Sequence, residues 1–400
     1  MSYFCIKINQ LMPSFSFNIF FTIVSGFIFT YICIPPIVRI SKEKHLFDVP
    51  NSRKLNKRVV PTLGGVGIFI GFTLSSILFL GNTPIPEFRY VYGSLIMLFF
   101  IGLKDDILIL AARKKLIVQA AAALMLVSLG HFQIMDLSNL FYLNHLAIWL
   151  SAPLSFMILL FIINSINLID GIDGLAAGLS IIISSVLGTW FLVTGHEDYA
   201  IVSFALTGSL LAFLRFNLWG GKFKIFMGDT GSLILGGILG VLVIKFLNFN
   251  MTAPAMFHFN HAPTFILSLL IVPVTDTLRV FAIRIYQKRS PFSPDMNHIH
   301  HLLIKSGMKH IQASGLLFLY TSFFVLLCQS SQEYLSSTAS FISILSLSFM
   351  AVGILAKRTE KIKFKRAKQI QHTRQILSSG IPLNEDPFKF ITSKSKILQN

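Results

Sequence analysis

Eleven apolar runs, most of them long enough to cross a bilayer as a helix, follow one another along this chain of 400 residues. A helix rises about 1.5 Å per residue, so about 20 apolar residues span the hydrocarbon core. Because 54% of the residues are hydrophobic and only 13% are charged, a water-soluble fold is excluded. The sequence predicts an all-α polytopic integral membrane protein with about 11 transmembrane helices. The runs cover 15–40, 63–81, 90–104, 115–130, 149–166, 176–194, 198–215, 229–248, 263–286, 313–329 and 337–356.

The basic residues predict how these helices are oriented. They gather in alternate connections and in the tail, whereas the other connections hold almost none. Lysine and arginine are enriched on the cytoplasmic side of membrane proteins, so these connections and the tail are expected there. The expected organisation is a periplasmic N-terminus at 1–14, a multi-span domain at 15–356 with cytoplasmic loops near 41–62, 104–115, 167–175, 216–228 and 287–312, and a basic cytoplasmic tail at 357–400.

The net charge of +17 is explained by these loops. In a soluble protein such a charge would suggest nucleic-acid binding, but basic patches interleaved with aromatic residues are absent, so no nucleic-acid partner is expected. The tail is expected to lie along anionic lipid. The three cysteines show no metal-ligand spacing, which argues against a zinc site or a disulfide framework. The outer segment 131–147 is either an interfacial helix or a small hairpin.

The 17 acidic residues carry most of the functional information. A carboxylate close to the hydrocarbon is costly, and such residues are candidates for function. Except for one within the ninth run, those near the apolar runs fall at helix ends predicted to face the cytoplasm. Carboxylates that converge there suggest a divalent cation, and hard oxygen ligands suit Mg²⁺. The residues concerned are Asp105, Asp106, Asp170, Asp173, Asp229 and, within the ninth run, Asp276.

Two of the acidic motifs are unfavourable unless they have a function. Asp105 and Asp106 close the third run in the motif GLKDD, where negative charge opposes the helix dipole. Asp170 and Asp173 lie in the dense motif NSINLIDGIDGL. Glycines in that motif favour a tight turn that can aim carboxylates, amides and asparagine side chains at one point.

The other motifs have structural explanations as well as functional ones. Asp229, in FMGDTGSL, is either an ordinary N-cap or part of a metal and phosphate site. The charges in DVPNSRK and the glycines in PTLGG suit either phosphate binding or membrane anchoring. Asp276 and Arg279, three residues apart in the ninth run, are expected to form a structural pair.

Histidines gather in the loop after the ninth run. Three of them occupy four positions in SPFSPDMNHIHH, but no cysteine or HExxH context supports zinc. Beside a phosphate site, they and Arg289 would neutralise charge on the transferring oxygens; a solvated cluster is the alternative.

The motifs occur in order over residues 40–305 and resemble those of the polyprenyl-phosphate N-acetylhexosamine-1-phosphate transferases, glycosyltransferase family 4. Initiators of O-antigen, enterobacterial common antigen and teichoic acid linkage units belong to this family. The sequence HIHH resembles the branch that uses GlcNAc more than the peptidoglycan branch. One departure is Asn56, which stands where the family often has a histidine.

The resemblance implies a multi-pass enzyme of the bacterial inner membrane. Such an enzyme transfers an N-acetylhexosamine-1-phosphate, GlcNAc-1-phosphate first, from a UDP-sugar to undecaprenyl phosphate and releases UMP. This is the first membrane step of a cell-envelope polysaccharide such as lipopolysaccharide. The implied cofactor is Mg²⁺, for which Mn²⁺ can substitute, and a homodimer is compatible with the resemblance.

Roles for individual residues follow from the same resemblance. Asp229 is expected to be the leading Mg²⁺ ligand, with Asp106 as a second, and Asp105 and Asp106 form a catalytic pair beside them. The residues expected to bind substrate are Lys115, Asn167, Asp170, Asp173, Arg289, His298, His300 and His301.

Two alternatives remain on the sequence. Within the enzyme class, the chain could be a phospho-MurNAc-pentapeptide translocase of peptidoglycan synthesis. From another class, a secondary transporter would also use intramembrane carboxylates. That alternative predicts charges near the midplane, broken helices and repeated halves, whereas here the acids lie at helix ends and no duplication is visible.

Overall fold

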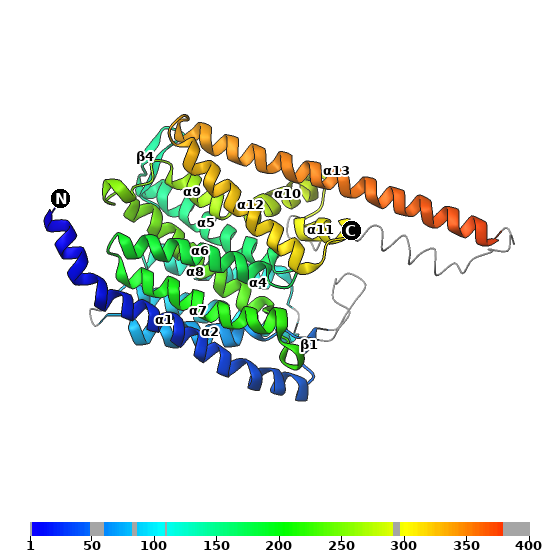
Figure 1. The fold of residues 1–400 in the computed structure, drawn as a ribbon, viewed down its shortest axis with the longest axis horizontal. Helices are drawn as coiled ribbons and strands as arrows, with labels where there is room; N and C mark the ends of the chain where they lie inside the picture. The colour runs from blue at the N-terminus through cyan, green and yellow to red at the C-terminus, as the bar shows by residue number, and fades with distance from the viewer. Residues whose placement is uncertain (1, 49–59, 82–85, 109, 291–296, 379–400) are drawn as a thin grey trace. The chain divides into compact units, whose positions relative to one another are not determined.

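The computed structural model describes residues 2–48, 60–81, 86–108, 110–290 and 297–378. By contacts, the chain divides into two compact units, Met1–Val352 and Gly353–Asn400, which are considered separately. Helices dominate the first unit (Figure 1). The described part of the second unit is the C-terminal portion of the last helix.

The helices are α1 (Ser2–Glu43), α2 (Gly64–Phe79), α3 (Phe88–Leu108), α4 (Ala112–Ser128), α5 (Ile148–Ile169), α6 (Leu175–Val193), α7 (Glu197–Trp219), α8 (Gly228–Asn250), α9 (Ala262–Leu269), α10 (Ile271–Tyr286), α11 (Ile299–Ser306), α12 (His310–Ser331) and α13 (Ser337–Ser378). Short 3-10 helices lie at Gly221–Phe223 and Ala255–Phe257. Two antiparallel hairpins pair β1 (Phe47–Asp48) with β2 (Val60–Pro61) and β3 (Asp136–Leu140) with β4 (Leu143–His145).

The prediction of a helical polytopic membrane protein is confirmed. Seven helices, namely α5, α6, α7, α8, α12 and segments of α1 and α13, are long and apolar enough to cross a membrane. The pair α9–α10, bent by 63°, would make an eighth. Each of the other predicted spans coincides with a helix, but α2 has only 16 residues, α3 carries charged residues near both ends, and α4 carries them at its start. The count of eleven crossings therefore stays a prediction.

Of the two alternatives for segment 131–147, the structure contains the hairpin, β3–β4. The turn predicted between the fifth and sixth runs is also present, because α5 ends at Ile169 and α6 begins at Leu175. The fifth helix continues three residues beyond the expected end at 166. That extra turn brings Asn167 onto the helix.

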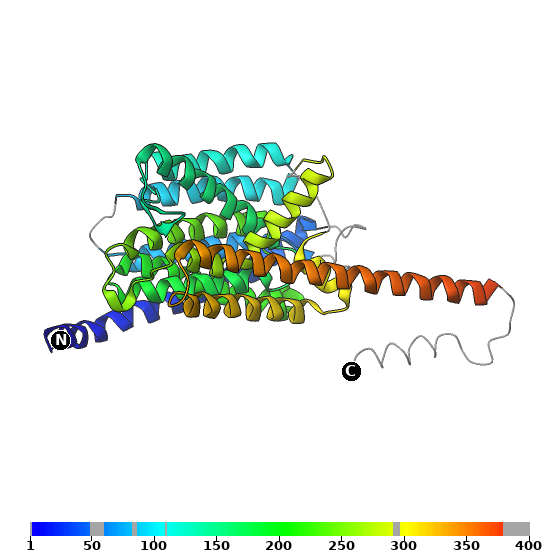
Figure 2. The same cartoon turned by 90° about the horizontal axis from the view of Figure 1, so that it is seen from above.

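α8 is the central helix of the first unit. It is hydrophobic on all sides, which is typical of a helix buried among others. It packs against α2, α3, α5, α6 and α9, and Leu233 forms a buried cluster with Leu98 of α3, Ala122 of α4 and Ile163 of α5. In Figure 2, α3 and α4 (cyan) form an outer layer beside it. α7 packs in turn on α1, α2 and α6.

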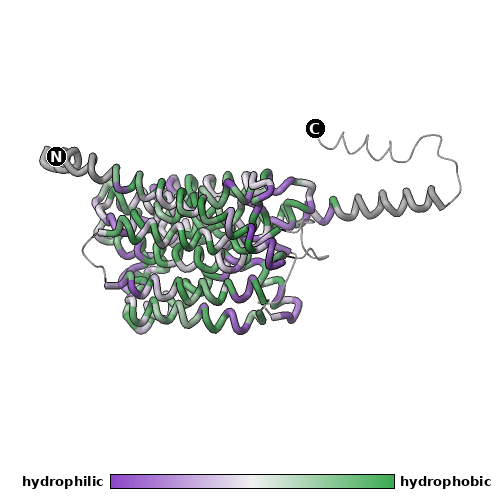
Figure 3. The backbone as a smooth tube through the Cα atoms, turned by 90° about the horizontal axis from the view of Figure 1, so that it is seen from below, coloured by the Kyte–Doolittle hydropathy of each residue, from purple (hydrophilic) through white to green (hydrophobic). Residues whose placement is uncertain are grey.

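Hydrophilic residues gather at the two ends of this helical bundle, and hydrophobic residues fill its length (Figure 3). β1 and α11 lie at one end and β4 at the other (Figure 1). Asp229 stands in the first turn of α8, while Lys245 lies sixteen residues further on, about 24 Å along the axis. The two residues therefore mark opposite ends of the bundle.

The end that carries Lys245 is held together by a partly buried ion pair. Lys245 Nζ lies 2.6 Å from a carboxylate oxygen of Glu87, which immediately precedes α3. Tyr199 of α7 donates its hydroxyl to the other oxygen. The ring centroid of Phe132 lies 4.7 Å from the ammonium, close enough for a cation–π interaction. These contacts join the ends of three helices remote from the acidic motifs.

Candidate active site

The carboxylate of Asp106 caps α8 from a neighbouring helix. Its Oδ1 accepts a hydrogen bond from the amide of Asp229 at 2.8 Å, and its Oδ2 accepts from the amide and hydroxyl of Thr230 at 3.0 and 2.6 Å. Gly228, with φ of 71°, precedes them, and a Cβ there would stand 2.6 Å from Asp106 Oδ2. Glycine is required at this position for conformation and for space. Asp106, rather than Asp229, therefore supplies the N-cap of α8.

The carboxylate of Asp229 is held by two side chains from other helices. Lys115 of α4 donates to Oδ2, and Asn167 of α5 donates to Oδ1 at 2.9 Å. Asn167 also donates to Ser232 Oγ at 2.8 Å, which fixes its amide orientation. The Lys115 ammonium lies 3.0 Å from Asp105 as well. Four helices, α3, α4, α5 and α8, thus bring these carboxylates and one cation together.

The turn between α5 and α6 brings Asp170 close to this cluster. Burial, together with the nearby charges of Asp229, Asp106 and Asp173, raises the pKa of Asp170 to about 8. The cluster therefore holds more negative charge than Lys115 alone neutralises. Such an excess is what a bound cation or a cationic ligand group would relieve.

Asp173, three residues later, has cationic partners of its own. Its Oδ2 lies 2.7 Å from Lys224 Nζ and 3.5 Å from His310 Nδ1. Burial alone would raise the pKa of Asp173, but the contacts with His310 and Lys224 outweigh it and lower the pKa. Sequence reasoning missed both partners: Lys224 counted only toward topology, and His310 begins α12, outside every motif.

His300, at the described end of the histidine loop, lies against the same turn. His300 packs its ring where a Cβ on Gly171 would stand, so only glycine leaves room for it. The ring of His298 is parallel to that of His300 at 5.6 Å between centroids, and that of His301 is 4.4 Å from His300. Arg289 was also predicted to bind substrate. It follows α10, and its backbone amide donates to the carbonyl of Arg284 at 2.8 Å.

The motif PTLGG has a structural explanation. The amides of Gly64 and Gly65 donate to the carbonyls of Phe226 and Met227, both at 2.9 Å, and the amide of Phe226 donates to Pro61 at 2.8 Å. The motif therefore fixes the segment that leads into Asp229. Asn56, most of DVPNSRK and residues 291–296 of the histidine loop lie outside the described residues.

This chain is similar to known sequences over most of its length. Residues 88–247 match the profile of glycosyl transferase family 4. A probable undecaprenyl-phosphate N-acetylglucosaminyl 1-phosphate transferase of Bacillus subtilis (strain 168) is 33% identical, over 80% of this chain and 88% of the relative. The chain belongs to glycosyl transferase family 4. Undecaprenyl-phosphate alpha-N-acetylglucosaminyl 1-phosphate transferases of Escherichia coli O157:H7 (27% identical, over 87% of this chain and 94% of the relative) and Yersinia pestis (26%, 80% and 88%) are further relatives.

The part matched to family 4 runs from the start of α3 almost to the end of α8. It therefore contains the carboxylate cluster and the α5–α6 turn. α10, the histidine loop and α11 lie beyond it, although the longer pairwise matches extend over most of the chain.

The acidic side chains of the cluster are chemically suitable ligands for magnesium. Asp105, Asp106, Asp170 and Asp229 offer hard oxygen ligands within one region. In the part of the chain that is described, however, no three histidine, cysteine or acidic side chains already surround one point as metal ligands. Lys115 lies between Asp105 and Asp229, in the position where a divalent cation would neutralise both. A cation bound between Asp105 and Asp229 would take the place of this ammonium.

Proposed function

We propose that this protein transfers GlcNAc-1-phosphate from UDP-GlcNAc to undecaprenyl phosphate and releases UMP. The printed names of the relatives support the sugar phosphate and the acceptor. The observation that carries the proposal is the convergence of Asp105, Asp106 and Asp229 with Lys115 and Asn167 at one end of a membrane bundle. Such a site can hold a diphosphate next to a lipid phase.

The chemistry needs alignment and charge neutralisation more than a strong base. The phosphate of the acceptor is already ionised at neutral pH, and one of its oxygens attacks the β-phosphorus of the nucleotide sugar. The bond from that phosphorus to the oxygen bridging the two phosphorus atoms breaks, and UMP leaves with the bridging oxygen. No proton has to be removed from the nucleophile, so positioning and electrostatic stabilisation carry the catalysis.

Each residue of the cluster has a role in this scheme. Lys115, with its ammonium between Asp105 and Asp229, is placed to bind a phosphate oxygen once released from one of them. Asp106 holds the N-terminus of α8, and Asn167 orients the carboxylate of Asp229. By the family resemblance, Asp170 and Asp173 would line the nucleotide-sugar site, together with His300, which packs on Gly171.

We propose Mg²⁺ as the cofactor, held by Asp229 with Asp106 as a second ligand. When bound, the ion would neutralise charge on the diphosphate. Each oxygen of Asp106 already accepts protein hydrogen bonds, so its share in metal binding would use the remaining lone pair of Oδ1. Asp229 is therefore the principal ligand in this proposal.

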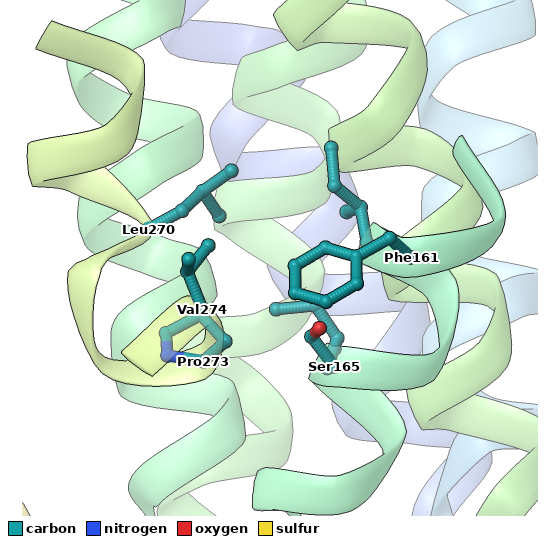
Figure 4. A pocket seen from close by; sticks show the side chains of 7 residues that line it. Phe161, Ser165, Leu270, Pro273 and Val274 are labelled. Carbon is teal, nitrogen blue, oxygen red and sulfur yellow. The ribbon is translucent and has the colours of Figure 1, made fainter. Parts of the chain in front are cut away.

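A shallow apolar recess lies on the bundle beside the cluster. It lies between α5 and the break that separates α9 from α10, and Figure 4 shows Phe161 and Ser165 facing Leu270, Pro273 and Val274. Its lining ends at Ile166, one residue before Asn167. Apolar surface therefore borders the polar site at Asn167, which suits an acceptor that has an apolar chain and a phosphate head.

The orientation belongs to the same proposal. Eleven crossings with the N-terminus outside would put the cluster, the α5–α6 turn and the histidine loop on the cytoplasmic side, where UDP-sugars are made. The protein would then lie in the bacterial inner membrane, with the tail in the cytoplasm.

The test is UMP release by the purified protein in detergent or nanodiscs, with undecaprenyl phosphate, Mg²⁺ and single UDP-sugars. We expect UMP with UDP-GlcNAc, none after EDTA, and none from the Asp229→Asn variant. UMP only from UDP-MurNAc-pentapeptide would assign the chain to peptidoglycan synthesis instead. Absence of UMP with every UDP-N-acetylhexosamine, in a protein shown to be folded, would overturn the proposed reaction.

A further inference from the structure

Asp276 is a buried carboxylate that the reaction scheme above does not use. It lies in the first half of α10, is only 1% exposed, and both of its oxygens have partners. Oδ2 lies 2.8 Å from His298 Nδ1, and Oδ1 accepts the amide of Ile299 at 2.7 Å. The sequence suggested a pair between Asp276 and Arg279, but the two Asp276 oxygens contact His298 and Ile299 instead. Arg279 donates to the carbonyl of Asn297.

The contact with His298 determines which nitrogen faces a ligand. A carboxylate can only accept, so the Nδ1 atom of His298 carries the proton that lies between them. The other nitrogen, Nε2, is then the one left for a substrate. A carboxylate bound to one nitrogen of a histidine fixes both the tautomer and the ring orientation, and in enzymes such partners change activity without touching substrate.

The contact with Ile299 extends this control to the rest of the loop. Ile299 is the first residue of α11, and the residue before it, His298, makes no side-chain cap. Asp276 therefore caps α11 from α10, as Asp106 caps α8 from α3. Because α11 carries His300 and His301, its position sets where these rings lie. His300 in turn rests on Gly171, next to Asp170.

We propose that Asp276 is a positioning residue: it holds His298 with Nε2 as an acceptor directed to a hydroxyl group of the sugar of the nucleotide sugar, and it anchors α11, with His300, on the α5–α6 turn. The proposal rests on the proposed function, since the ligand is the same UDP-sugar. Uridine monophosphate alone lacks the β-phosphate and the sugar, so its binding does not depend on this arrangement.

Two substitutions separate the roles of the pair. Asp276→Asn keeps the shape and keeps an oxygen for the amide of Ile299, but it can donate to Nδ1 and so allows the wrong tautomer. His298→Asn keeps a side-chain N–H at the position of Nδ1, which satisfies Asp276, but has no atom in place of Nε2. We expect each variant to lower kcat/KM for UDP-GlcNAc by about 10–100-fold.

The double variant provides the decisive comparison. If Asp276 acts through His298, then Asp276→Asn lowers kcat/KM no further in the His298→Asn background. Independent, multiplicative losses would show that Asp276 acts on the fold instead, and would overturn the proposal. His258→Asn is the matched control, because His258 bonds to the carbonyl of Asn250 beyond the end of α8 remote from Asp229; it is expected to leave kcat/KM unchanged.

Ligand-induced thermal shifts provide a readout without turnover. UDP-GlcNAc and UMP are each added to the purified wild type and variants. We expect both variants to lose most of the shift caused by UDP-GlcNAc and to keep the shift caused by UMP. Variants that retain the UDP-GlcNAc shift, or turn over like the wild type, would overturn the role of Asp276. A wild type that binds UDP-GlcNAc but releases no UMP would overturn only the proposed reaction.

Discussion

Asp106 of α3 and Asp229 of α8 are joined through the backbone, since the amide of Asp229 donates to the carboxylate of Asp106 at 2.8 Å. Negative charge at a helix N-terminus is stabilising, because the first amides have no partner within the helix. Asp106 thereby sets the position of the helix end on which Asp229 stands. The two carboxylates repel each other, but the arrangement keeps the side chain of Asp229 directed to Lys115 and Asn167.

Removing the charge of Asp106 should therefore displace Asp229. In Asp106→Asn, one side-chain atom becomes a donor that faces the amides of Asp229 or Thr230, so at least one cap bond is lost. We expect UMP release to fall about 100-fold or more, with the protein still in the membrane. Thr230→Val removes only the hydroxyl contact and should have a smaller effect. Activity of Asp106→Asn within about threefold of the wild type would contradict this role.

Lys115 should compete with Mg²⁺ for the carboxylates it now binds. In Lys115→Met, Asp105 and Asp229 lose their cation, so the Mg²⁺ concentration that gives half of the metal-induced thermal shift should fall about tenfold. UMP release should nevertheless decrease, because a phosphate partner is lost. Lys114→Met is the matched control, since the neighbouring Lys114 is exposed. A weaker response to Mg²⁺ in Lys115→Met would show that no competition occurs.

Much of the helical arrangement could be predicted from the sequence, because long apolar runs have one solution in a membrane, a helix that satisfies its own backbone. The helix ends were less certain. The prediction ended the fifth span at 166, where polar residues begin, but α5 continues to Ile169 because Asn167 finds partners in Asp229 and Ser232. Tertiary hydrogen bonds of this kind cannot be inferred from hydrophobicity.

For the candidate site, the sequence indicates which residue types gather but not which side chains contact one another. Carboxylates at helix ends predict a convergence at one region, and the structure brings Asp105, Asp106 and Asp229 together there, while their function stays a prediction. Their partners depend on the packing of several helices. From the sequence, Asp229 is a candidate N-cap of α8, whereas Asp106 supplies that cap in the structure. Asp276 contacts His298, which is twenty-two residues away along the chain. Lys224 and His310, which hold Asp173, gave no signal in any motif.

Asp170 should make the stability of the metal-free protein depend on pH. Its pKa is raised to about 8, above the ordinary value of 3.8, so the folded state binds its proton more tightly than the unfolded state. Its contribution to stability is complete below about pH 4, falls as the pH rises and is lost above about pH 8. Asp170→Asn resembles the protonated side chain and does not titrate.

The difference in apparent melting temperature between Asp170→Asn and the wild type, measured in EDTA at one scan rate, should therefore grow in favour of the variant between about pH 5 and 8 and level off above. A change of about 3 °C or more is expected. Asp136→Asn, which changes an acid in the β3–β4 hairpin, serves as control. A difference that does not vary with pH would show that Asp170 is ionised throughout.

The ion pair at the other end of the bundle should stabilise the protein without affecting chemistry. Lys245 is 8% exposed and lies about 24 Å along α8 from Asp229, so neither Lys245 nor Glu87 can reach the substrate. Lys245→Met leaves Glu87 without its cation, and Glu87→Gln leaves the ammonium among aromatic rings. Each single variant should lower the apparent melting temperature by several degrees, because a buried charge without its partner is costly.

The double variant should be more stable than the sum of the two losses predicts, since neither charge then remains unpaired. The expected coupling is about 1 kcal/mol or more. It is measured as the amount by which the double variant's loss of melting temperature is smaller than the sum of the two single losses. UMP release at a temperature where all variants are folded should stay within about threefold of the wild type. Additive losses would mean that Lys245 and Glu87 do not interact, and a large loss of turnover in folded protein would mean that this end of the bundle is coupled to the site.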